Sequence, residues 1–271
     1  MLRAAQLVPR LSRAARPAAL GRPTPTARGL ARVIPSHLAN LPHVDLLLDK
    51  SKVTAPVSVR NIYCIGRNYA EHATELGNAV PNEAPVIFLK SSASIRPLDD
   101  GYRPHECAFD DEPLHFEAEL VLLVGSHVPL ASLREGRETE CLQGFGLGLD
   151  LTRRGVQSEL KREGKPWTLA KSFAGSAVVT TMQRCNDPSD LDVGFSLVVN
   201  GAERQHGHVS QMIFDIPFQL RYLNSFTGLL PGDLVFTGTP AGVGECRRGD
   251  QVALTLHHDD GRKDVRFKGV L

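Results

Sequence analysis

The sequence contains no apolar run that approaches the ~20 residues needed for a membrane-spanning helix. It also lacks an excess of charge of either sign, because 31 lysines and arginines offset 30 aspartates and glutamates. A basic surplus is the usual electrostatic signature of nucleic-acid binding. We therefore expect neither a membrane nor a nucleic acid as a partner. With 271 residues, 42% of them hydrophobic, the chain is long enough to enclose a core.

Cysteine is scarce and shows no binding pattern. The five cysteines are odd in number and without a Cys-x-x-Cys spacing: Cys64, Cys107, Cys141, Cys185 and Cys246. A disulfide framework or a zinc site would require regular pairs. The pattern predicts reduced thiols in a reducing compartment.

The N-terminus lacks acidic residues, and the first acidic residue of the chain is Asp45. Residues 1–33 contain seven arginines and no lysine. An arginine-rich, acid-poor composition is typical of an organellar transit peptide, and a disordered basic tail is the alternative. We predict that residues 1–35 are a disordered mitochondrial transit peptide, which directs the protein to the matrix. Residues 36–271 are then expected to form a single domain.

Two glutamates, Glu117 and Glu119, precede the apolar residues 120–124. Alternate residues of a strand point to the same face, so the two charges would lie together. Buried carboxylates are normally paired with cations or bound to a metal ion. A divalent cation is the simplest counter-charge, because the segment itself contains no lysine or arginine. The alternatives are a hydrated strand end, or neutralisation by arginines or lysines distant in the sequence.

A third carboxylate, Asp150, ends a strand-like segment in which Gly144, Gly146 and Gly148 share its face. Three glycines on one face indicate that another segment approaches closely. Three carboxylates would suit an all-oxygen site for Mg²⁺, Mn²⁺ or Ca²⁺. Lys171 follows in an otherwise apolar stretch, where it either extends to solvent or pairs with a buried charge.

His72 and Glu75 are three residues apart in a predicted helix over residues 68–76, so they share one face. A carboxylate beside an imidazole orients the ring and stabilises its cation, which makes a general base. Such a pair on a helix surface is also common without any function. Its place just beyond a predicted strand favours the catalytic interpretation.

Polar side chains downstream offer further candidates. Arg154 and Gln157 are neighbours on one face of a predicted helix over residues 154–164, which is equally compatible with a solvated surface. Thr239 lies in a tight turn after an apolar strand. Its hydroxyl and the nearby backbone can donate to a carboxylate, although a purely structural turn is nearly as plausible from the sequence alone.

The remaining chain reads as short strands with few helices. Strands are predicted at residues 44–48, 59–65, 86–89, 193–200, 203–208, 252–257 and 264–267, and a turn followed by a strand at residues 230–236. A helix is predicted at residues 215–224, capped by Asp215, and a long polar loop at residues 91–113. Asn200-Gly201 predicts a hairpin turn. The absence of regular strand–helix alternation excludes doubly wound and TIM-barrel architectures and predicts a mixed, β-rich α+β domain.

Several segments together resemble the fumarylacetoacetate hydrolase (FAH) family, and within it the mitochondrial acylpyruvase and oxaloacetate decarboxylase branch. The matching segments occur in family order at residues 61–75, 85–90, 117–119, 149–152, 166–173, 199–201 and 237–244. The resemblance implies a β-roll with short helices, like the C-terminal domain of that family. Residues 36–271 would then be a single catalytic domain, assembled as a homodimer.

The resemblance also assigns roles to individual residues. It implies a site for Mg²⁺, with Mn²⁺ or Ca²⁺ as alternatives, built from Glu117, Glu119 and Asp150. It implies catalytic roles for His72, Glu75 and Lys171. It places the following residues around the substrate: Arg67, Lys90, Arg154, Gln157 and Thr239.

The implied activity is Mg²⁺-dependent hydrolysis of a carbon–carbon bond in 3-acylpyruvates, which releases pyruvate, together with decarboxylation of oxaloacetate. The substrate is expected to be a small anionic 2-oxo acid. Keto–enol tautomerisation of oxaloacetate and the isomerisation or decarboxylation of 2-hydroxy-diene-dioates are alternatives within the family. A metal-binding scaffold of the same fold without enzymatic activity is the alternative from a different class.

Overall fold

The computed structural model describes residues 42–47, 54–77, 79–98, 113–126 and 136–271. The chain divides into Met1–Ala39 and Asn40–Leu271, and the described residues all belong to the second unit. The predicted transit peptide and Cys107 lie outside them. The four described cysteines are free thiols. None of the helices in the described ranges is both long and apolar enough to cross a membrane.

Short strands dominate the described residues, as predicted. The strands are β1 His43–Leu47, β2 Thr54–Ser58, β3 Ile62–Gly66, β4 Val86–Lys90, β5 Ile95–Pro97, β6 Leu114–Phe116, β7 Ala118–Val124, β8 Leu142–Asp150, β9 Ala177–Val179, β10 Gln183–Arg184, β11 Val193–Val199, β12 Ala202–His208, β13 Leu234–Phe236, β14 Gly244–Cys246, β15 Gln251–His258 and β16 Val265–Val270. The α-helices are α1 Ala70–Glu75, α3 Arg154–Arg162, α4 Thr168–Lys171 and α5 Ile216–Phe226.

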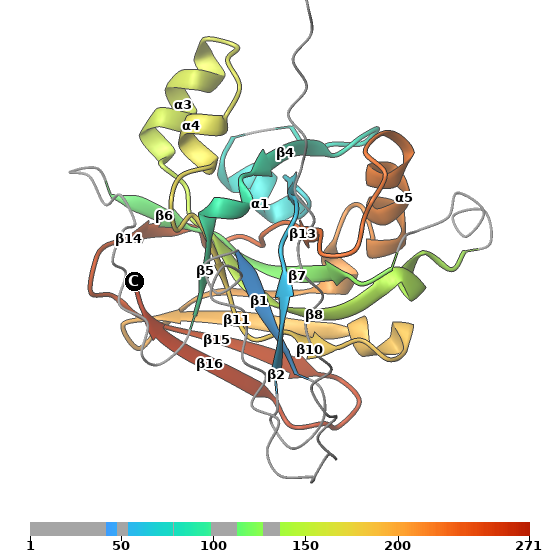
Figure 1. Cartoon of the computed structure of the whole chain (residues 1–271). Coiled ribbons are helices and arrows are strands. Elements are labelled where there is room, and N and C mark those ends of the chain that lie inside the picture. The colour runs from blue at the N-terminus through green and yellow to red at the C-terminus, as the bar shows by residue number, and fades with distance from the viewer. Residues whose placement is uncertain (1–41, 48–53, 78, 99–112, 127–135) are drawn as a thin grey trace, which may run out of the picture. The chain divides into compact units, whose positions relative to one another are not determined.

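The larger sheet has eight strands in the order β4-β3-β13-β7-β8-β9-β5, with β10 paired to β8. It is mixed, because β13 pairs in parallel with β3 and antiparallel with β7. Figure 1 shows α3 and α4 together at one end of this sheet, near β4.

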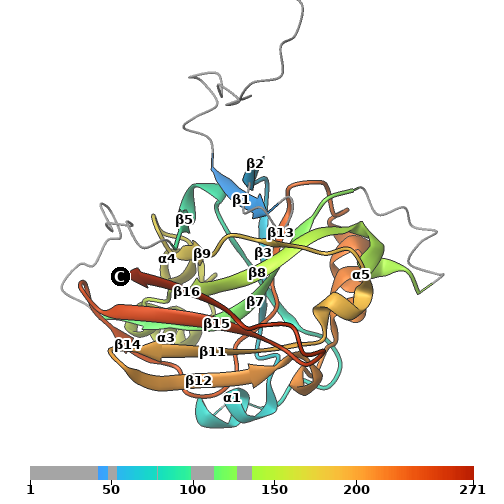
Figure 2. The ribbon, with the colours of Figure 1, turned by 90° about the horizontal axis from the view of Figure 1, so that it is seen from below.

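A second sheet contains four antiparallel strands in the order β12-β11-β15-β16 (Figure 2). The turn between β11 and β12 contains Asn200 and Gly201, both with positive φ, at 51° and 81°. Such angles at both central residues define the type of turn that Asn-Gly sequences favour. The predicted hairpin is confirmed.

The two sheets share one hydrophobic core. Leu120 and Leu122 of β7 belong to the same buried cluster as Phe195 and Leu197 of β11. On the opposite face of β7, Val121 joins a second buried cluster. Strand β7 is therefore buried on both faces, which explains why residues 120–124 are continuously apolar instead of alternating.

The glycine face of β8 is closely covered, as predicted. A Cβ on Gly144 would lie 2.6 Å from the carbonyl oxygen of Gln183, and one on Gly148 would lie 2.7 Å from that of Val178. Strands β9 and β10 are antiparallel neighbours of β8 in the same sheet, and larger side chains at these glycines would press against their backbone. This packing holds the end of β8, and Asp150 with it, beside Ala177 of β9.

The structure corrects the predicted loop at residues 91–113. Residues 95–97 form β5, which pairs in parallel with β9, while residues 99–112 lie outside the described ranges. The prediction was wrong for β5 because a three-residue strand carries almost no pattern of its own. Its conformation depends on a partner that lies about eighty residues later in the chain.

Candidate active site

Three carboxylates converge where β7 begins and β8 ends. Ligand oxygens of Glu117, Glu119 and Asp150 all lie within 4.8 Å of one another, and all three residues are buried. Glu117 occupies the break between β6 and β7, and its carbonyl oxygen accepts a 2.8 Å hydrogen bond from the Asp150 amide. Glu119 pairs with Gly148, two residues before Asp150. The sheet register thus brings the three predicted ligands together.

Two of the three carboxylates are paired with cations. Lys171 Nζ lies 2.8 Å from Glu117 Oε2 and 2.6 Å from Asp150 Oδ2. Arg154 Nη2 contacts the other oxygen of Glu117, and Lys90 Nζ lies 2.6 Å from Asp150 Oδ1. Neutralisation by lysines and arginines distant in the sequence was one of the alternatives for the glutamate pair. It applies to Glu117 and Asp150.

Glu119 differs from its two neighbours. It is 2% exposed, forms no salt bridge with any described residue, and accepts a 2.8 Å hydrogen bond from the Gly238 amide. Burial, followed by the charges of Asp150 and Glu117, raises the pKa of Glu119 well above its usual range. A divalent cation would remove this cost, because it supplies the missing positive charge. The donor set consists only of carboxylate oxygens and fits Mg²⁺, Mn²⁺ or Ca²⁺.

Glu117 and Lys171 hold each other in their charged forms. Burial alone would raise the pKa of Glu117, but Lys171 and then Arg154 outweigh it and hold that pKa well below its usual range. Burial likewise opposes the charge on Lys171, and the carboxylates of Asp150 and Glu117 raise its pKa nonetheless. The site therefore contains an ionised carboxylate and an ammonium group at any pH near neutrality.

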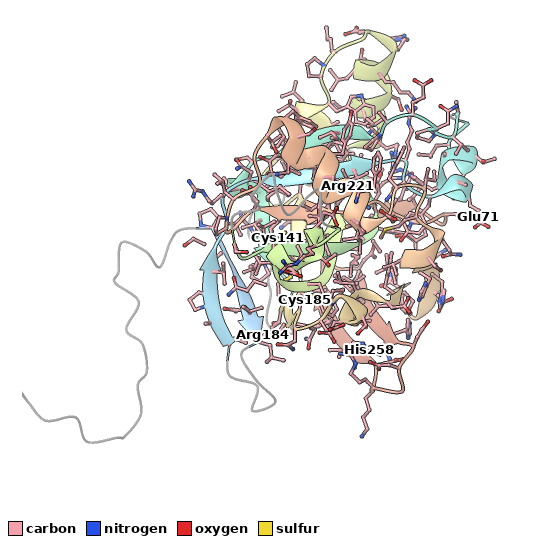
Figure 3. All side chains as sticks on the ribbon, turned by 90° about the vertical axis from the view of Figure 1, so that its right-hand side faces the viewer. Glu71, Cys141, Arg184, Cys185, Arg221 and His258 are labelled. Carbon is pink, nitrogen blue, oxygen red and sulfur yellow. The ribbon has the colours of Figure 1, made fainter. Side chains whose placement is uncertain are left out.

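The predicted dyad lies on α1. His72 is buried, whereas the preceding residue Glu71 is exposed at the periphery of the molecule (Figure 3). His72 Nδ1 and Glu75 Oε2 are 3.5 Å apart, which orients the ring without forming a close hydrogen bond. Burial lowers the pKa of His72 despite the nearby Glu117, so the imidazole is neutral at pH 7. A neutral buried imidazole is suited to accept a proton.

Glu75 is itself held by the chain. Its two carboxylate oxygens lie 3.1 and 3.2 Å from the amide of Gly242, which donates to them. Gly242 has a φ of +95° and lies where a Cβ would be only 2.0 Å from the carbonyl oxygen of Arg204, so the position requires glycine. The sequence predicted a tight turn at Thr239, but not that Gly242 anchors the dyad.

A cleft of about 120 Å³ connects the carboxylates with the dyad and with α3. Its lining includes seven more of the predicted residues besides Glu119: Arg67, His72, Glu117, Arg154, Gln157, Lys171 and Thr239. Asp150, Glu75 and Lys90 are not part of this lining. The ammonium of Lys90 contacts Asp150 and donates to the carbonyl oxygens of Leu151 and Lys171.

The hydroxyl group of Thr239 forms hydrogen bonds with other residues of the protein. The hydroxyl donates to the carbonyl oxygen of Ala118 at 2.8 Å and accepts from Gln205 Nε2 at 2.7 Å. Gln205 Oε1 in turn accepts from the Ala118 amide at 2.8 Å. Ala118, the residue between the two glutamates, is thus clamped on both sides. Sequence reasoning missed Gln205, because nothing local marks one glutamine of an outer strand as buried.

Seven further residues line the cleft without having been predicted, namely Ile65, Gly66, Leu76, Phe88, Ser158, Lys161 and Trp167. Lys161 was accessible to sequence reasoning, because it lies seven residues after Arg154 and four after Gln157. That spacing places all three on one face of α3. The rings of Phe88 and Trp167 lie 5.8 Å apart between centroids, tilted by 56°, and form an aromatic wall. Their meeting depends on β4 and α4 packing together, which the sequence does not indicate.

A second group of potential ligands, Asp192, His208 and Asp259, is largely exposed. His208 Nδ1 accepts a hydrogen bond from the Ser210 amide at 3.1 Å, so the neutral ring carries its proton on Nε2. That nitrogen faces Asp259 Oδ2 at 3.1 Å. A protonated nitrogen cannot coordinate a metal ion, and the group is better described as a polar helix cap.

A serine, a histidine and an aspartate also line up on the four-stranded sheet. Ser196 Oγ lies 2.9 Å from His257 Nε2, and His257 Nδ1 lies 2.7 Å from Asp264 Oδ2. Ser196 is 4% exposed and lies within β11, where the ladders to β12 and β15 occupy the backbone amides. An oxyanion hole needs backbone or side-chain donors beside the nucleophile. The arrangement therefore stabilises the sheet.

Comparison with known proteins identifies the family. Residues 61–265 match the family model described as fumarylacetoacetate (FAA) hydrolase C-terminal. The chain belongs to the fumarylacetoacetate hydrolase family. Among its relatives, the mitochondrial oxaloacetate tautomerase FAHD1 of Bos taurus is 39% identical over 212 residues, covering 77% of this chain and 91% of the relative. Oxaloacetate tautomerase YcgM of Escherichia coli is 38% identical over 205 residues, covering 73% and 89%.

Solved structures of the FAH family share the fold. Fumarylpyruvate hydrolase of Pseudomonas aeruginosa, in complex with Mn²⁺ and pyruvate, has a TM-score of 0.69 at 32% identity and covers 84% of this chain and 95% of its own. A 2-hydroxyhepta-2,4-diene-1,7-dioate isomerase of Mycobacterium marinum has a TM-score of 0.59 at 30% identity, covering 80% and 77%. The predicted family and its β-rich fold are confirmed, and these FAH relatives are enzymes.

Proposed function

We propose that this FAH-family chain is a divalent-metal-dependent enzyme for small 2-oxo acids, and that its first reaction is the keto–enol tautomerisation of oxaloacetate. One observation carries the proposal. A neutral, buried imidazole faces the same cleft as three clustered carboxylates, one of which has no cationic partner among the described residues. This combination can hold a chelating 2-oxo acid beside a base. The names of the FAHD1 and YcgM relatives support the choice of oxaloacetate.

The chain's own residues divide the work. Glu117, Glu119 and Asp150 would hold a cation that, when bound, polarises the keto group as a Lewis acid. His72 removes a proton from C3 of oxaloacetate through Nε2, since Nδ1 faces Glu75, and returns it to the keto oxygen.

Lys171 and the Arg154–Gln157 pair are proposed to stabilise the charge of the substrate and to orient it. Lys171 stays protonated and neutralises the negative charge that develops on the substrate oxygen. Arg154 donates to Gln157 Oε1 at 2.7 Å, which directs the opposite end of that amide. The amide NH₂ of Gln157 has no partner among the described side chains and is available to the substrate carboxylate.

Hydrolysis of 3-acylpyruvates is the second candidate, supported by the similarity to fumarylpyruvate hydrolase and by the aromatic wall of Phe88 and Trp167. Here His72 takes a proton from water, and the hydroxide adds to the distal carbonyl. The carbon–carbon bond then breaks to give a carboxylic acid and pyruvate. Decarboxylation of oxaloacetate to pyruvate and carbon dioxide requires no proton removal by His72.

Direct assays of the purified protein test the proposal. Tautomerisation is followed from the ultraviolet absorbance of enol oxaloacetate, and cleavage of acetylpyruvate from pyruvate release. Each assay is run with Mg²⁺, Mn²⁺ or Ca²⁺ and with a chelator. We expect at least one metal-dependent activity, with tautomerisation the faster. Protein that binds metal but accelerates neither reaction would instead support the metal-binding scaffold.

The proposal places the enzyme in the mitochondrial matrix. Mammalian and plant relatives carry a mitochondrial designation in their names, whereas the Escherichia coli relative does not. We expect residues 1–40, fused to a fluorescent reporter, to direct it into mitochondria, because residues 1–33 contain seven arginines and no acid. The matched control replaces these arginines with glutamine and should stay in the cytosol. A cytosolic reporter with the native segment would contradict the assignment.

A further inference from the structure

We infer that Arg67 and Lys161 form an anion-binding subsite in the cleft, and that it receives the distal carboxylate of a dicarboxylic 2-oxo acid. Arg67 lies between β3 and α1, and Lys161 lies on α3, yet both line the cleft that contains Glu117 and Glu119. The inference rests on the proposed function and deepens it. It defines the substrate class as four-carbon diacids in preference to acids with one carboxylate.

Arg67 has donors to spare. Its side chain is half-buried in the cleft lining and forms no hydrogen bond or salt bridge with any described residue. Arg154, in the same cleft, is by contrast committed to Glu117 and Gln157. A guanidinium group offers five N–H donors in a planar fork that matches a carboxylate. Half-burial beside the metal-binding carboxylates suits Arg67 to receive an anion from the substrate.

The backbone of Arg67 gives an independent indication. Its φ is +59°, in the left-handed region that residues other than glycine rarely adopt. The other described non-glycine residue with positive φ is Asn200, where the hairpin turn accounts for it. No such turn type requires left-handed geometry at Arg67. Strained backbone of this kind is concentrated at ligand clamps and active sites, and here it sets the direction of a cleft-lining arginine.

The charges of the cleft favour a dianion. Lys90, Lys171 and Arg154 pair with Glu117 and Asp150, and their three positive charges equal in number the negative charges of the three carboxylates. The divalent cation and Arg67 therefore both add positive charge in excess. Burial, and then Arg67 and Arg154, lower the pKa of Lys161, which places these three cations within reach of one another's fields. A substrate with two carboxylates offsets this excess better than one with a single carboxylate.

The kinetic test compares substrates that differ in charge. Arg67→Met should lower kcat/KM for oxaloacetate by ~10–100-fold, the value of a charge-assisted hydrogen bond, and change that for acetylpyruvate less than about 3-fold. Lys161→Met should act in the same direction by about 3–10-fold. Arg67→Lys should recover part of the loss. The control is Arg162→Met, on the same helix but outside the cleft lining, and should leave both substrates unaffected.

A binding measurement separates the subsite from the reaction. Malate and lactate are unreactive here and differ only in the distal carboxylate. Calorimetric titration of Mn²⁺-loaded protein should show malate binding ~10-fold or more tighter than lactate, with the difference lost in Arg67→Met. That result supports the subsite even if tautomerase activity is absent. Equal losses for both ligands, or for both substrates in an active enzyme, would overturn it and leave the proposed function intact.

Discussion

Glu119→Gln is expected to abolish metal-dependent turnover and to weaken Mn²⁺ binding beyond detection. Glu119 is the one carboxylate of the cluster without a cationic partner among the described residues, so its charge is the one available to a metal ion. Without it, Glu117 and Asp150 face three cationic side chains, and the site repels a further positive charge. Calorimetric titration with Mn²⁺ and the tautomerase assay measure the two losses.

Glutamine is the informative replacement, because its amide oxygen can still accept the hydrogen bond from Gly238. Glu138→Gln is the matched control, since Glu138 is equally buried but pairs with Arg221 at 2.8 Å outside the cleft. It should retain metal affinity. Full activity of Glu119→Gln without added metal would refute the assignment of the metal site, and Glu119→Ala should lose activity as completely.

The same variant has a predicted effect on stability. The raised pKa of Glu119 means that the folded metal-free protein favours the protonated carboxyl. The stabilisation of the folded state by the protonated carboxyl is fully present below the pKa that Glu119 has in the unfolded chain. It is lost as the pH rises through the raised pKa of the folded state. Metal-free Glu119→Gln should therefore unfold at a temperature equal to or above that of the wild type at pH 8. With saturating Mn²⁺ the order should reverse, because only the wild type gains binding energy.

His72→Ala should lower both tautomerisation of oxaloacetate and cleavage of acetylpyruvate by ~10²–10⁴-fold, the usual contribution of general-base catalysis. Decarboxylation of oxaloacetate should fall less, because it needs no proton removal by an imidazole. Mn²⁺ affinity should change little, since His72 is not among the proposed ligands. The measurements are kcat/KM for the three reactions at saturating metal. His206→Ala, an exposed histidine on β12, serves as control.

The wild-type pH profile tests the same role. Because burial lowers the pKa of His72 from its ordinary 6.5, the neutral base persists below that pH, and kcat/KM should fall only on further acidification. His72→Ala should lack this acidic limb. If the variant instead loses all three reactions equally, His72 has a function common to them, and its assignment as the base that removes a proton is wrong.

The sequence by itself determined much of this protein's local structure. The Asn200-Gly201 turn, the glycine face of β8 and the short helix with His72 and Glu75 follow from patterns within a few residues. The alternation of side chains along a strand and the preferences of turn residues act over that short range, so both can be predicted from the sequence without knowledge of the fold. The three carboxylates could also be identified as candidate ligands from the sequence, because charged residues at the ends of apolar strands are conspicuous.

Only the tertiary structure decided how those charges are balanced. Lys171 pairs with a glutamate 54 residues earlier in the chain, and Lys90 pairs with Asp150 although the resemblance suggested substrate contact. Glu119 is set apart as the carboxylate without a cationic partner in the described structure. Electrostatic pairing depends on distances of a few ångströms between side chains. Those distances arise where β7, β8 and α4 meet, and no local pattern in the chain encodes them.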